Sequence, residues 1–141
     1  MNYSDEVMDH FKNPRNMGEI EGADGVGEVG NLKCGDVMRV FIKVAKRPIK
    51  TRELKVKSEK LKVEEYISDI KFQTLGCAAA IAASSMMTEL AKGKNLEDAE
   101  KITRDDINDS LGKLPAQKYH CSVLSAEGIR KAIEDYRGKK R

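Results

Sequence analysis

Residues 67–90 read ISDIKFQTLGCAAAIAASSMMTEL, and the change of pattern within this stretch decides the fold class. The first half carries Ile70 and Phe72 at alternate positions, which is the periodicity of a half-buried strand. The second half, residues 78–90, is rich in alanine and other strong helix formers. A strand is therefore expected to lead directly into a helix, with Cys77 at the start of that helix.

More strands are expected before this stretch. Alternating apolar residues predict one over residues 38–45, which Pro48 should end, and another over residues 52–57. The glycine-rich residues 18–30 predict irregular structure, and their spacing fits neither a Walker loop nor a dinucleotide fingerprint. Together with residues 67–74, these strands predict a small antiparallel meander of about three strands.

More helices are expected at the N-terminus and after the strands. The expected N-caps are Ser4, Asn95 and Thr103, the last in a capping box with Asp106. The corresponding helices should cover residues 4–12, residues 96–101 and a segment that ends at Gly112, and a last helix should run over residues 122–137 and end at Gly138. Strands followed by helices indicate an α+β fold with the helices packed on one face of the sheet.

The composition is that of one domain without a disulfide framework. The chain has 141 residues, of which 40% are hydrophobic and 35% charged, so it can bury a core of its own. No apolar run approaches the about 20 residues of a membrane span, and no secretion signal opens the chain, so we expect a cytoplasmic protein with no membrane partner. The net charge of +3 is low for a protein that binds nucleic acid, and its excess of basic residues lies mainly at about 46–65.

Three cysteines, Cys34, Cys77 and Cys121, dominate the chemistry of the sequence. An odd number of cysteines without a secretion signal favours thiolate or metal chemistry over disulfides, although free cysteines can also be small buried hydrophobes. Cys77 and Cys121 are each expected at a helix start, where free amides stabilise a thiolate, and Cys34 lies in a glycine-flanked loop beside Lys33. We therefore expect all three to be nucleophilic and to be good metal ligands.

Two further ligand types accompany these cysteines. Asp36 follows Cys34 by two residues, and His120 directly precedes Cys121, whereas His10 has no such neighbour and is expected at the surface or its boundary. Three sulfurs with an imidazole and a carboxylate suit zinc or an iron–sulfur cluster, and a hard oxygen ligand should weaken the retention of a cluster. A Cys–His hydrolase fits less well, because neighbouring side chains in an extended segment point apart.

Three motifs and the opening residues resemble the IscU/NifU-type iron–sulfur cluster assembly scaffold family. The motifs are Lys33-Cys34-Gly35-Asp36, the Gly76-Cys77 turn with the following Ala80-Ile81-Ala82-Ala83-Ser84-Ser85, and Lys118-Tyr119-His120-Cys121-Ser122; the opening match runs from Tyr3 to Gly18. The resemblance covers most of residues 1–141. It implies a single scaffold domain whose ligand loops gather at one end.

The same resemblance implies a function and its partners. The five residues Cys34, Asp36, Cys77, His120 and Cys121 would bind iron and hold a [2Fe–2S] cluster, in a scaffold rather than an enzyme. Sulfur would arrive as a persulfide from a cysteine desulfurase of the IscS/NifS type, on Cys121 or alternatively on Cys34. A ferredoxin-type electron donor and recipient apoproteins would complete the process, while a homodimer stays open. Family members also bind zinc at these residues, so the alternative is a zinc-bound persulfide acceptor that holds no cluster.

The chain departs from the family pattern at three places. Ala78 stands where a glycine is common, which should stiffen the turn without removing a ligand. The segment between Cys34 and Cys77 is longer than usual, with its surplus in the basic region at about 46–65, which we interpret as an extended hairpin. Leu114-Pro115-Ala116-Gln117-Lys118 stands in place of Leu-Pro-Pro-Val-Lys, which weighs against recognition by a dedicated Hsp70-type chaperone.

Overall fold

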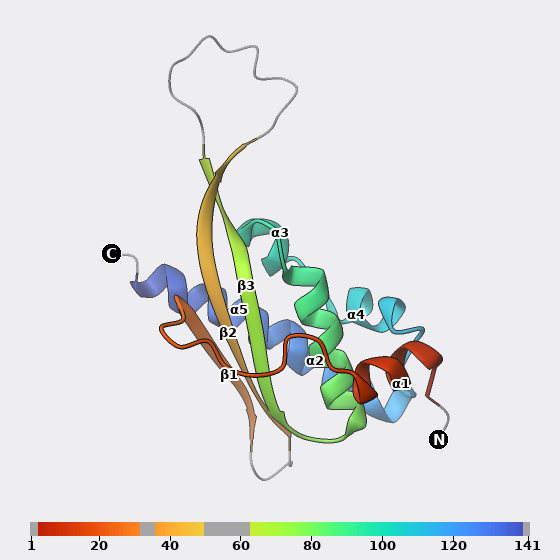
Figure 1. Cartoon of the computed structure of the whole chain (residues 1–141). Coiled ribbons are helices and arrows are strands. Elements are labelled where there is room, and N and C mark those ends of the chain that lie inside the picture. Colours follow the sequence, from red (N-terminus) through yellow and green to blue (C-terminus); the bar gives the residue numbers. More distant parts are fainter. Residues whose placement is uncertain (1–2, 32–35, 50–62, 140–141) are drawn as a thin grey trace.

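The structure is a computed structural model that describes residues 3–31, 36–49 and 63–139 (Figure 1). Cys34, the strand expected over residues 52–57 and most of the basic region lie outside the described residues. The described elements are α1 (Asp5–Lys12), β1 (Gly25–Asn31), β2 (Asp36–Pro48), β3 (Val63–Leu75), α2 (Ala78–Ala91), α3 (Leu96–Glu100), α4 (Arg104–Ser110), the 3-10 turn η2 (Ala116–Lys118) and α5 (Tyr119–Lys139).

The strands form one antiparallel sheet in the order β1-β2-β3, and the α+β prediction is confirmed. In β2, Ile42 pairs with Gly25 of β1 on one side and with Ile70 of β3 on the other. The register between β2 and β3 shifts at Lys43 and Val44, where the ladder has an irregularity. Helices α2 and α5 cover one face of the sheet, and the other helices pack around them (Figure 1).

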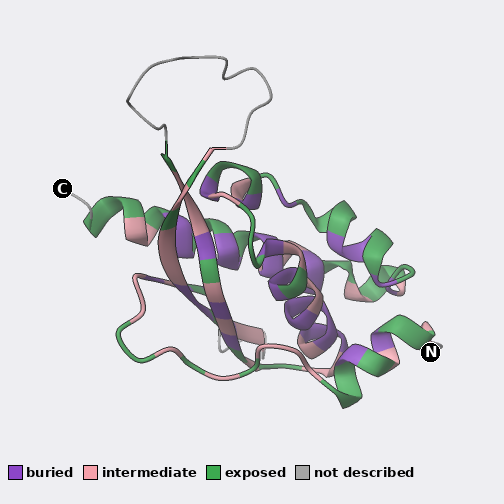
Figure 2. Cartoon of the chain, turned by 45° about the horizontal axis from the view of Figure 1, so that its top comes forward, coloured by how far each residue is buried: buried purple, intermediate pink, exposed green. Residues whose placement is uncertain are grey.

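The core lies between that face of the sheet and the two helices, and buried residues line the sides that they turn toward each other (Figure 2). The residues that α2 buries are mostly small, among them Ala79, Ala82, Ala83 and Ser84. Large, fully buried side chains of the core come from the sheet and from both helices, among them Met38, Ile42, Ile67, Ile70, Met87, Ile129 and Ile133. Within the described residues no helix is long and apolar enough to cross a membrane.

Strand β1 is a correction to the sequence prediction, which took residues 18–30 as irregular. Gly25 and Gly27 lie against the backbone of α5: a Cβ on Gly25 would come within 2.2 Å of the Ala132 carbonyl oxygen, and one on Gly27 within 2.5 Å of that of Gly128. These glycines allow a helix to pack directly on a strand, a use of glycine that resembles a flexible segment in sequence alone.

Strand β2 also continues through the residues that were expected to end it. Pro48 pairs with Val63 at the last position of the described ladder, where proline is tolerated because no further backbone hydrogen bond is required. Arg47 supports this end of the hairpin through an ion pair with Glu64 (3.7 Å) and by lying over the ring of Tyr66 (4.4 Å to its centre). The hairpin therefore projects beyond the helices (Figure 1).

Both edges of the sheet carry additional contacts. At the β3 edge, Phe72 donates its amide to Asn16 (2.9 Å) and accepts from the amide of Gly18 (2.8 Å). The chain then crosses the face of the sheet opposite the helices to reach β1 (Figure 1). At the β1 edge, the amide of Val26 donates to the carboxylate of Asp135 in α5 (2.8 Å). Such contacts occupy backbone groups that would otherwise be free to pair with another strand.

The predicted N-caps are confirmed, but the last helix is longer than expected. Ser4 and Asn95 accept from the amides three residues later, and Thr103 and Asp106 form a capping box. Helix α5 begins at Tyr119 rather than at residue 122, and it continues to Lys139 through Gly138. The segment before it is the short turn η2 instead of a loop, so it delivers the chain directly into the helix.

Candidate metal centre

The predicted ligand residues that the structure describes gather at one end of the molecule. Asp36 is the first residue of β2, and Cys77 is the N-cap of α2 just after β3. His120 and Cys121 lie in the first turn of α5. Cys34, two residues before Asp36, lies outside the described residues. Segments far apart in sequence thus supply one site.

Asp36, His120 and Cys121 form a group that could hold a metal ion. The Oδ2 atom of Asp36 lies 3.0 Å from Nε2 of His120, and the same nitrogen lies 3.6 Å from Sγ of Cys121. One ligand atom from each residue lies within 4.8 Å of the other two. The imidazole is half exposed while the carboxylate is largely covered, so the group is open on the histidine side. An oxygen, a nitrogen and a sulfur at this spacing suit a tetrahedral ion such as zinc, with room for a further ligand.

The helical placement of His120 and Cys121 overturns one premise of the sequence analysis. In an extended segment their side chains would point apart, but in the first turn of α5 the imidazole reaches the thiol. Burial, together with the nearby charges of Cys77 and Asp36, raises the pKa of Cys121 to about 12. The raised pKa disfavours the Cys121 thiolate in the metal-free protein, so the contact with His120 does not by itself create an activated hydrolase nucleophile. The nucleophilicity of the three cysteines stays a prediction.

Cys77 behaves as expected from its position at a helix start. Burial alone raises its pKa, but the amides of Ala80 and Ala79 and the charge of Lys118 outweigh this effect, so the pKa is lowered overall. The sulfur makes no conventional capping hydrogen bond, and the stabilisation is that of amides pointing toward a partial charge.

The positive charge of Lys118 interacts mainly with Cys77 rather than with Cys121, its nearer neighbour in the sequence. Lys118 is expected beside Cys121, yet its positive charge is one of the causes that lower the pKa of the Cys77 thiol. The negative charge of that sulfur is the main cause that raises the pKa of Lys118. The turn η2 ends at Lys118, directly before the start of α5.

His10 is a correction of another kind, because it is buried rather than at the surface. Its Nδ1 lies 2.7 Å from the hydroxyl oxygen of Ser85 in α2, and that oxygen also accepts the amide of Arg15 (2.9 Å). Burial lowers the pKa of His10. The signal that identifies it is helical spacing: His10 follows the fully buried Val7 by three residues and so lies on the same face of α1.

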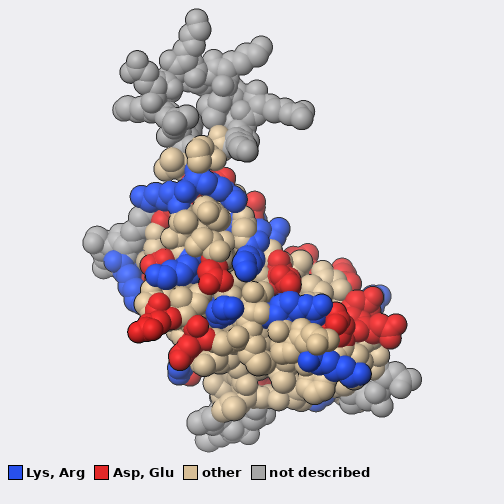
Figure 3. All heavy atoms as spheres, in the orientation of Figure 1, with Lys and Arg blue, Asp and Glu red and all other residues tan. Residues whose placement is uncertain are grey.

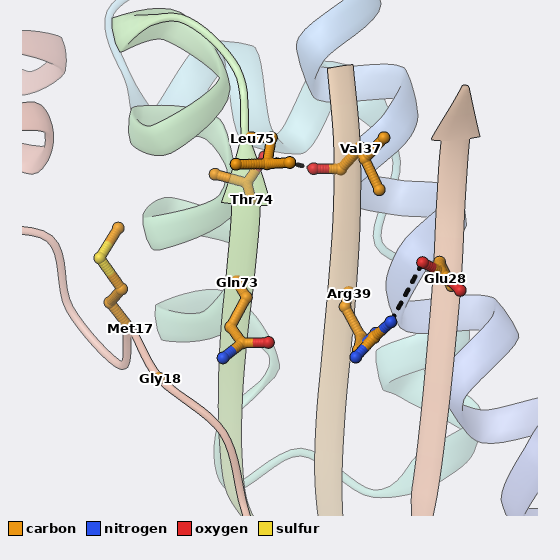
Figure 4. A pocket seen from close by; sticks show the side chains of 8 residues that line it. All are labelled: Met17, Gly18, Glu28, Val37, Arg39, Gln73, Thr74 and Leu75. Carbon is orange, nitrogen blue, oxygen red and sulfur yellow. Dashed lines mark hydrogen bonds and ion pairs between the residues drawn. The ribbon is translucent and has the colours of Figure 1, made fainter. Parts of the chain in front are cut away.

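A shallow hollow of about 640 Å³ lies on the opposite face of the sheet, next to the same end (Figure 4). Arg39 crosses its floor to pair with Glu28 at 3.3 Å. The exposed Leu75, which lines this hollow, precedes Cys77 by two residues in the sequence. Its lining residues are Met17, Gly18, Glu28, Val37, Arg39, Gln73, Thr74 and Leu75. On the face drawn in Figure 3, acidic and basic side chains alternate over the body of the domain.

The chain matches a known family along almost its whole length. The sequence profile of the family described as "NifU-like N terminal domain" matches residues 2–141. The iron–sulfur cluster assembly scaffold protein IscU 1 of Archaeoglobus fulgidus is 56% identical over 134 residues, which cover 95% of this chain and 76% of that protein. The iron–sulfur cluster assembly scaffold protein IscU of Escherichia coli K12 is 42% identical over 143 residues, which cover 99% and 98%.

A solved structure shares the fold. The N-terminal part of a nitrogen-fixing NifU-like protein from Brucella abortus superposes with a TM-score of 0.68, over 96% of this chain and 94% of its own. The two sequences are only 15% identical, so this likeness concerns the fold alone. It matches the sheet and helices described above.

Proposed function

Because this chain belongs to the family of NifU-like N-terminal domains, we propose that it is a scaffold on which a [2Fe–2S] cluster is assembled and from which it passes to recipient apoproteins. The observation that carries the proposal is the convergence of Asp36, His120 and Cys121 within 4.8 Å of one another. Cys77, whose charge contributes to the raised pKa of Cys121, adds a second sulfur at the same end of the molecule. Such a mixed set binds iron and sulfide while leaving them exchangeable.

The cluster would be held by ligands drawn from Cys34, Asp36, Cys77, His120 and Cys121. Thiolates are the preferred ligands of iron–sulfur clusters, and histidine replaces cysteine in some of them. The carboxylate of Asp36 is the hard ligand of the set, so it favours release of the cluster. Its hydrogen bond to His120 holds the imidazole beside the sulfur of Cys121 until iron arrives.

Sulfur would arrive as a persulfide from a cysteine desulfurase, with Cys121 as the receiving thiol and Cys34 as the alternative. In this transfer the outer sulfur atom of the desulfurase persulfide would move to the sulfur of Cys121, and a proton would move the other way. The products would be a desulfurase thiol and a Cys121 persulfide. Cys121 is fully buried in the metal-free protein, so the first turn of α5 has to open for the transfer. A ferredoxin-type donor would then supply the electrons that convert the persulfide sulfur to sulfide. The chain itself would accept the sulfur and hold the cluster, with no catalytic turnover of its own.

A second candidate function is a zinc-bound persulfide acceptor that holds no cluster. The observation that favours it is the spacing of Asp36, His120 and Cys121, which suits one tetrahedral ion as well as it suits a cluster. In that case the cysteine desulfurase would supply all of the sulfur, and the protein would pass this sulfur to an acceptor without iron. Both functions are consistent with a cytoplasmic protein.

Recognition by an Hsp70-type chaperone through residues 114–118 is not part of the proposal. Besides the departure from the family motif, Leu114 is buried in the core, so its side chain is not available to a partner in the folded protein. To bind in an extended conformation in the groove of a chaperone, residues 114–118 would have to unfold η2 and withdraw Leu114 from the core.

Anaerobic reconstitution tests the two functions against each other. The metal-free protein is mixed with ferrous iron, cysteine, a cysteine desulfurase and a reductant, and the visible spectrum is recorded after desalting. A coloured product with equal amounts of iron and acid-labile sulfide is expected of the scaffold. A colourless product that holds neither iron nor acid-labile sulfide would exclude the scaffold and favour the second function.

A further inference from the structure

The Asp36 carboxylate has a different neighbour at each of its two oxygens. Oδ2 lies 3.0 Å from Nε2 of His120. Oδ1 lies beside Gly76, where a Cβ added to the glycine would come within 2.9 Å of that oxygen, which is too close for a real side chain. The carboxylate therefore lies between the imidazole of His120 and a residue that has no side chain.

The ends of two neighbouring strands bring Asp36 and Gly76 together. The ladder between β2 and β3 has Val37 opposite Leu75 as its last pair at this end. Asp36 and Gly76 are the next residues along the two strands. The hydroxyl group of Thr74 also donates to the carbonyl oxygen of Val37 at 2.8 Å (Figure 4). The two backbones are thus held together here, which leaves little room for a side chain at both positions.

The backbone conformation of Gly76 does not itself require a glycine. Its φ lies outside the left-handed region, so an alanine could adopt it without strain. An added Cβ would instead meet two side chains, Oδ1 of Asp36 at 2.9 Å and Cβ of Ala80 at 2.8 Å. Ala80 is buried in the first turn of α2 and moves only with that helix, whereas a carboxylate can rotate about its own bonds. We therefore expect a methyl group at position 76 to displace the carboxylate.

We infer that Gly76 is a positioning residue of the candidate metal centre, because the space it leaves lets the Asp36 carboxylate lie beside the backbone and reach His120. The inference rests on the proposed function, in which Asp36 and His120 are candidate cluster ligands. Residues outside a ligand set commonly orient the ligands through hydrogen bonds. Gly76 orients its ligand through absent volume, so its effect should vanish when the carboxylate is removed.

A double-mutant cycle tests this dependence on Asp36. The proteins are the full-length, metal-free wild type, Gly76→Ala, Asp36→Ala and the double variant. Heteronuclear NMR at one pH records the imidazole signals of His120, with His10, the other histidine of the chain, as the internal reference. Gly76→Ala should shift the His120 signals in the same direction as Asp36→Ala, and it should add no shift in the Asp36→Ala background. Gly138→Ala, whose added carbon has nothing within 4 Å, is the matched control and should leave these signals unchanged.

Transfer of an assembled cluster to an apoferredoxin measures the consequence for the site. Gly76→Ala should slow the transfer by about fivefold, as is expected for Asp36→Ala, and the double variant should be no slower than Asp36→Ala alone. Adding Ala80→Gly to Gly76→Ala removes the second close contact of the new methyl group. This change should not restore the wild-type signals of His120.

Three outcomes of the NMR cycle would overturn the inference. These are unchanged His120 signals in Gly76→Ala, an equal added shift in the Asp36→Ala background, and recovery of the wild-type signals with Ala80→Gly. Circular dichroism checks folding, and Gly76→Ala with Ala80→Gly takes the place of Gly76→Ala in the cycle if the single variant does not fold. Reconstitution with iron is a separate readout: a wild-type protein that builds a cluster while the cycle fails contradicts only this inference, and the converse contradicts only the scaffold.

Discussion

Asp36 and His120 lie 84 residues apart in the sequence, yet Oδ2 of the first and Nε2 of the second are 3.0 Å apart. The contact joins the start of β2 to the first turn of α5. Cys121 lies in that turn of α5, and Cys34 precedes the first residue of β2 by two positions in the sequence. The contact positions an imidazole that would otherwise be free to rotate, because its side chain is half exposed. The carboxylate therefore has two roles, as a ligand and as a partner of a ligand.

Asp36→Ala should make an assembled cluster leave about fivefold more slowly, because the hard ligand is lost and sulfur or imidazole can replace it. The measurement is the rate of cluster transfer to an apoferredoxin, followed by circular dichroism. Asp109→Ala, at an exposed position of α4, is the matched control and should transfer at the wild-type rate. Equal rates in Asp36→Ala and the wild type would remove Asp36 from its releasing role.

Lys118→Met should raise the pKa of Cys77, because the nearby cation that favours the thiolate is lost. Alkylation of Cys77 by iodoacetamide at neutral pH should then slow by about threefold, as read from peptide masses. Lys101→Met removes an exposed lysine of the α3 end and should leave the rate unchanged. A wild-type rate in Lys118→Met would show that the α2 amides alone stabilise the thiolate.

His10 should make the protein less stable in mild acid. Burial lowers its pKa below the ordinary value of 6.5, and Arg15 adds to this effect while Asp9 and Glu89 oppose it. The unfolded chain therefore takes up the proton first, so the free energy of unfolding falls as the pH drops below about 6.5 until the folded pKa is passed. His10→Gln should flatten this part of the profile in urea titrations between about pH 5 and about pH 7.5. An unchanged slope would assign the acid sensitivity to other groups.

Gly27→Ala should lower the free energy of unfolding by about 1–3 kcal/mol, because the new methyl group would meet the backbone of α5 at 2.5 Å. Gly138→Ala is the matched control, since it lies in the same helix with nothing within 4 Å of the added carbon. It should be neutral or stabilise by up to about 1 kcal/mol through helix propensity. Urea denaturation of both variants measures the difference, and equal stabilities would contradict the close packing of β1 on α5.

The local features of the fold could be predicted from the sequence because their causes are local. The caps at Ser4, Asn95 and Thr103 follow from a side chain and an amide three residues apart, and all are confirmed. Strand β1 could not be predicted, since the reason for Gly25 and Gly27 lies in α5, about a hundred residues later. The length of β2 was missed because Pro48 is disfavoured inside a sheet but not at the end of a ladder.

The candidate site could likewise be predicted only in part from the sequence. The resemblance identified Asp36, Cys77, His120 and Cys121 as a set, and the structure brings these four to one end. The opposite pKa shifts of the two cysteines depend in part on burial, which no motif records: Cys77 is partly buried and Cys121 is fully buried. The effect of the Lys118 charge on Cys77 depends likewise on the turn η2, which no pattern in the sequence indicated.

The two shielded borders of the sheet limit how copies of this protein can associate. One border is covered by the backbone of Asn16 and Gly18, and on the other the Asp135 carboxylate holds the Val26 amide. Strand-to-strand polymerisation would have to displace these groups first. A dimer, if one forms, is therefore expected to join through side chains on the outer surface and not by extending the sheet from one molecule into the next.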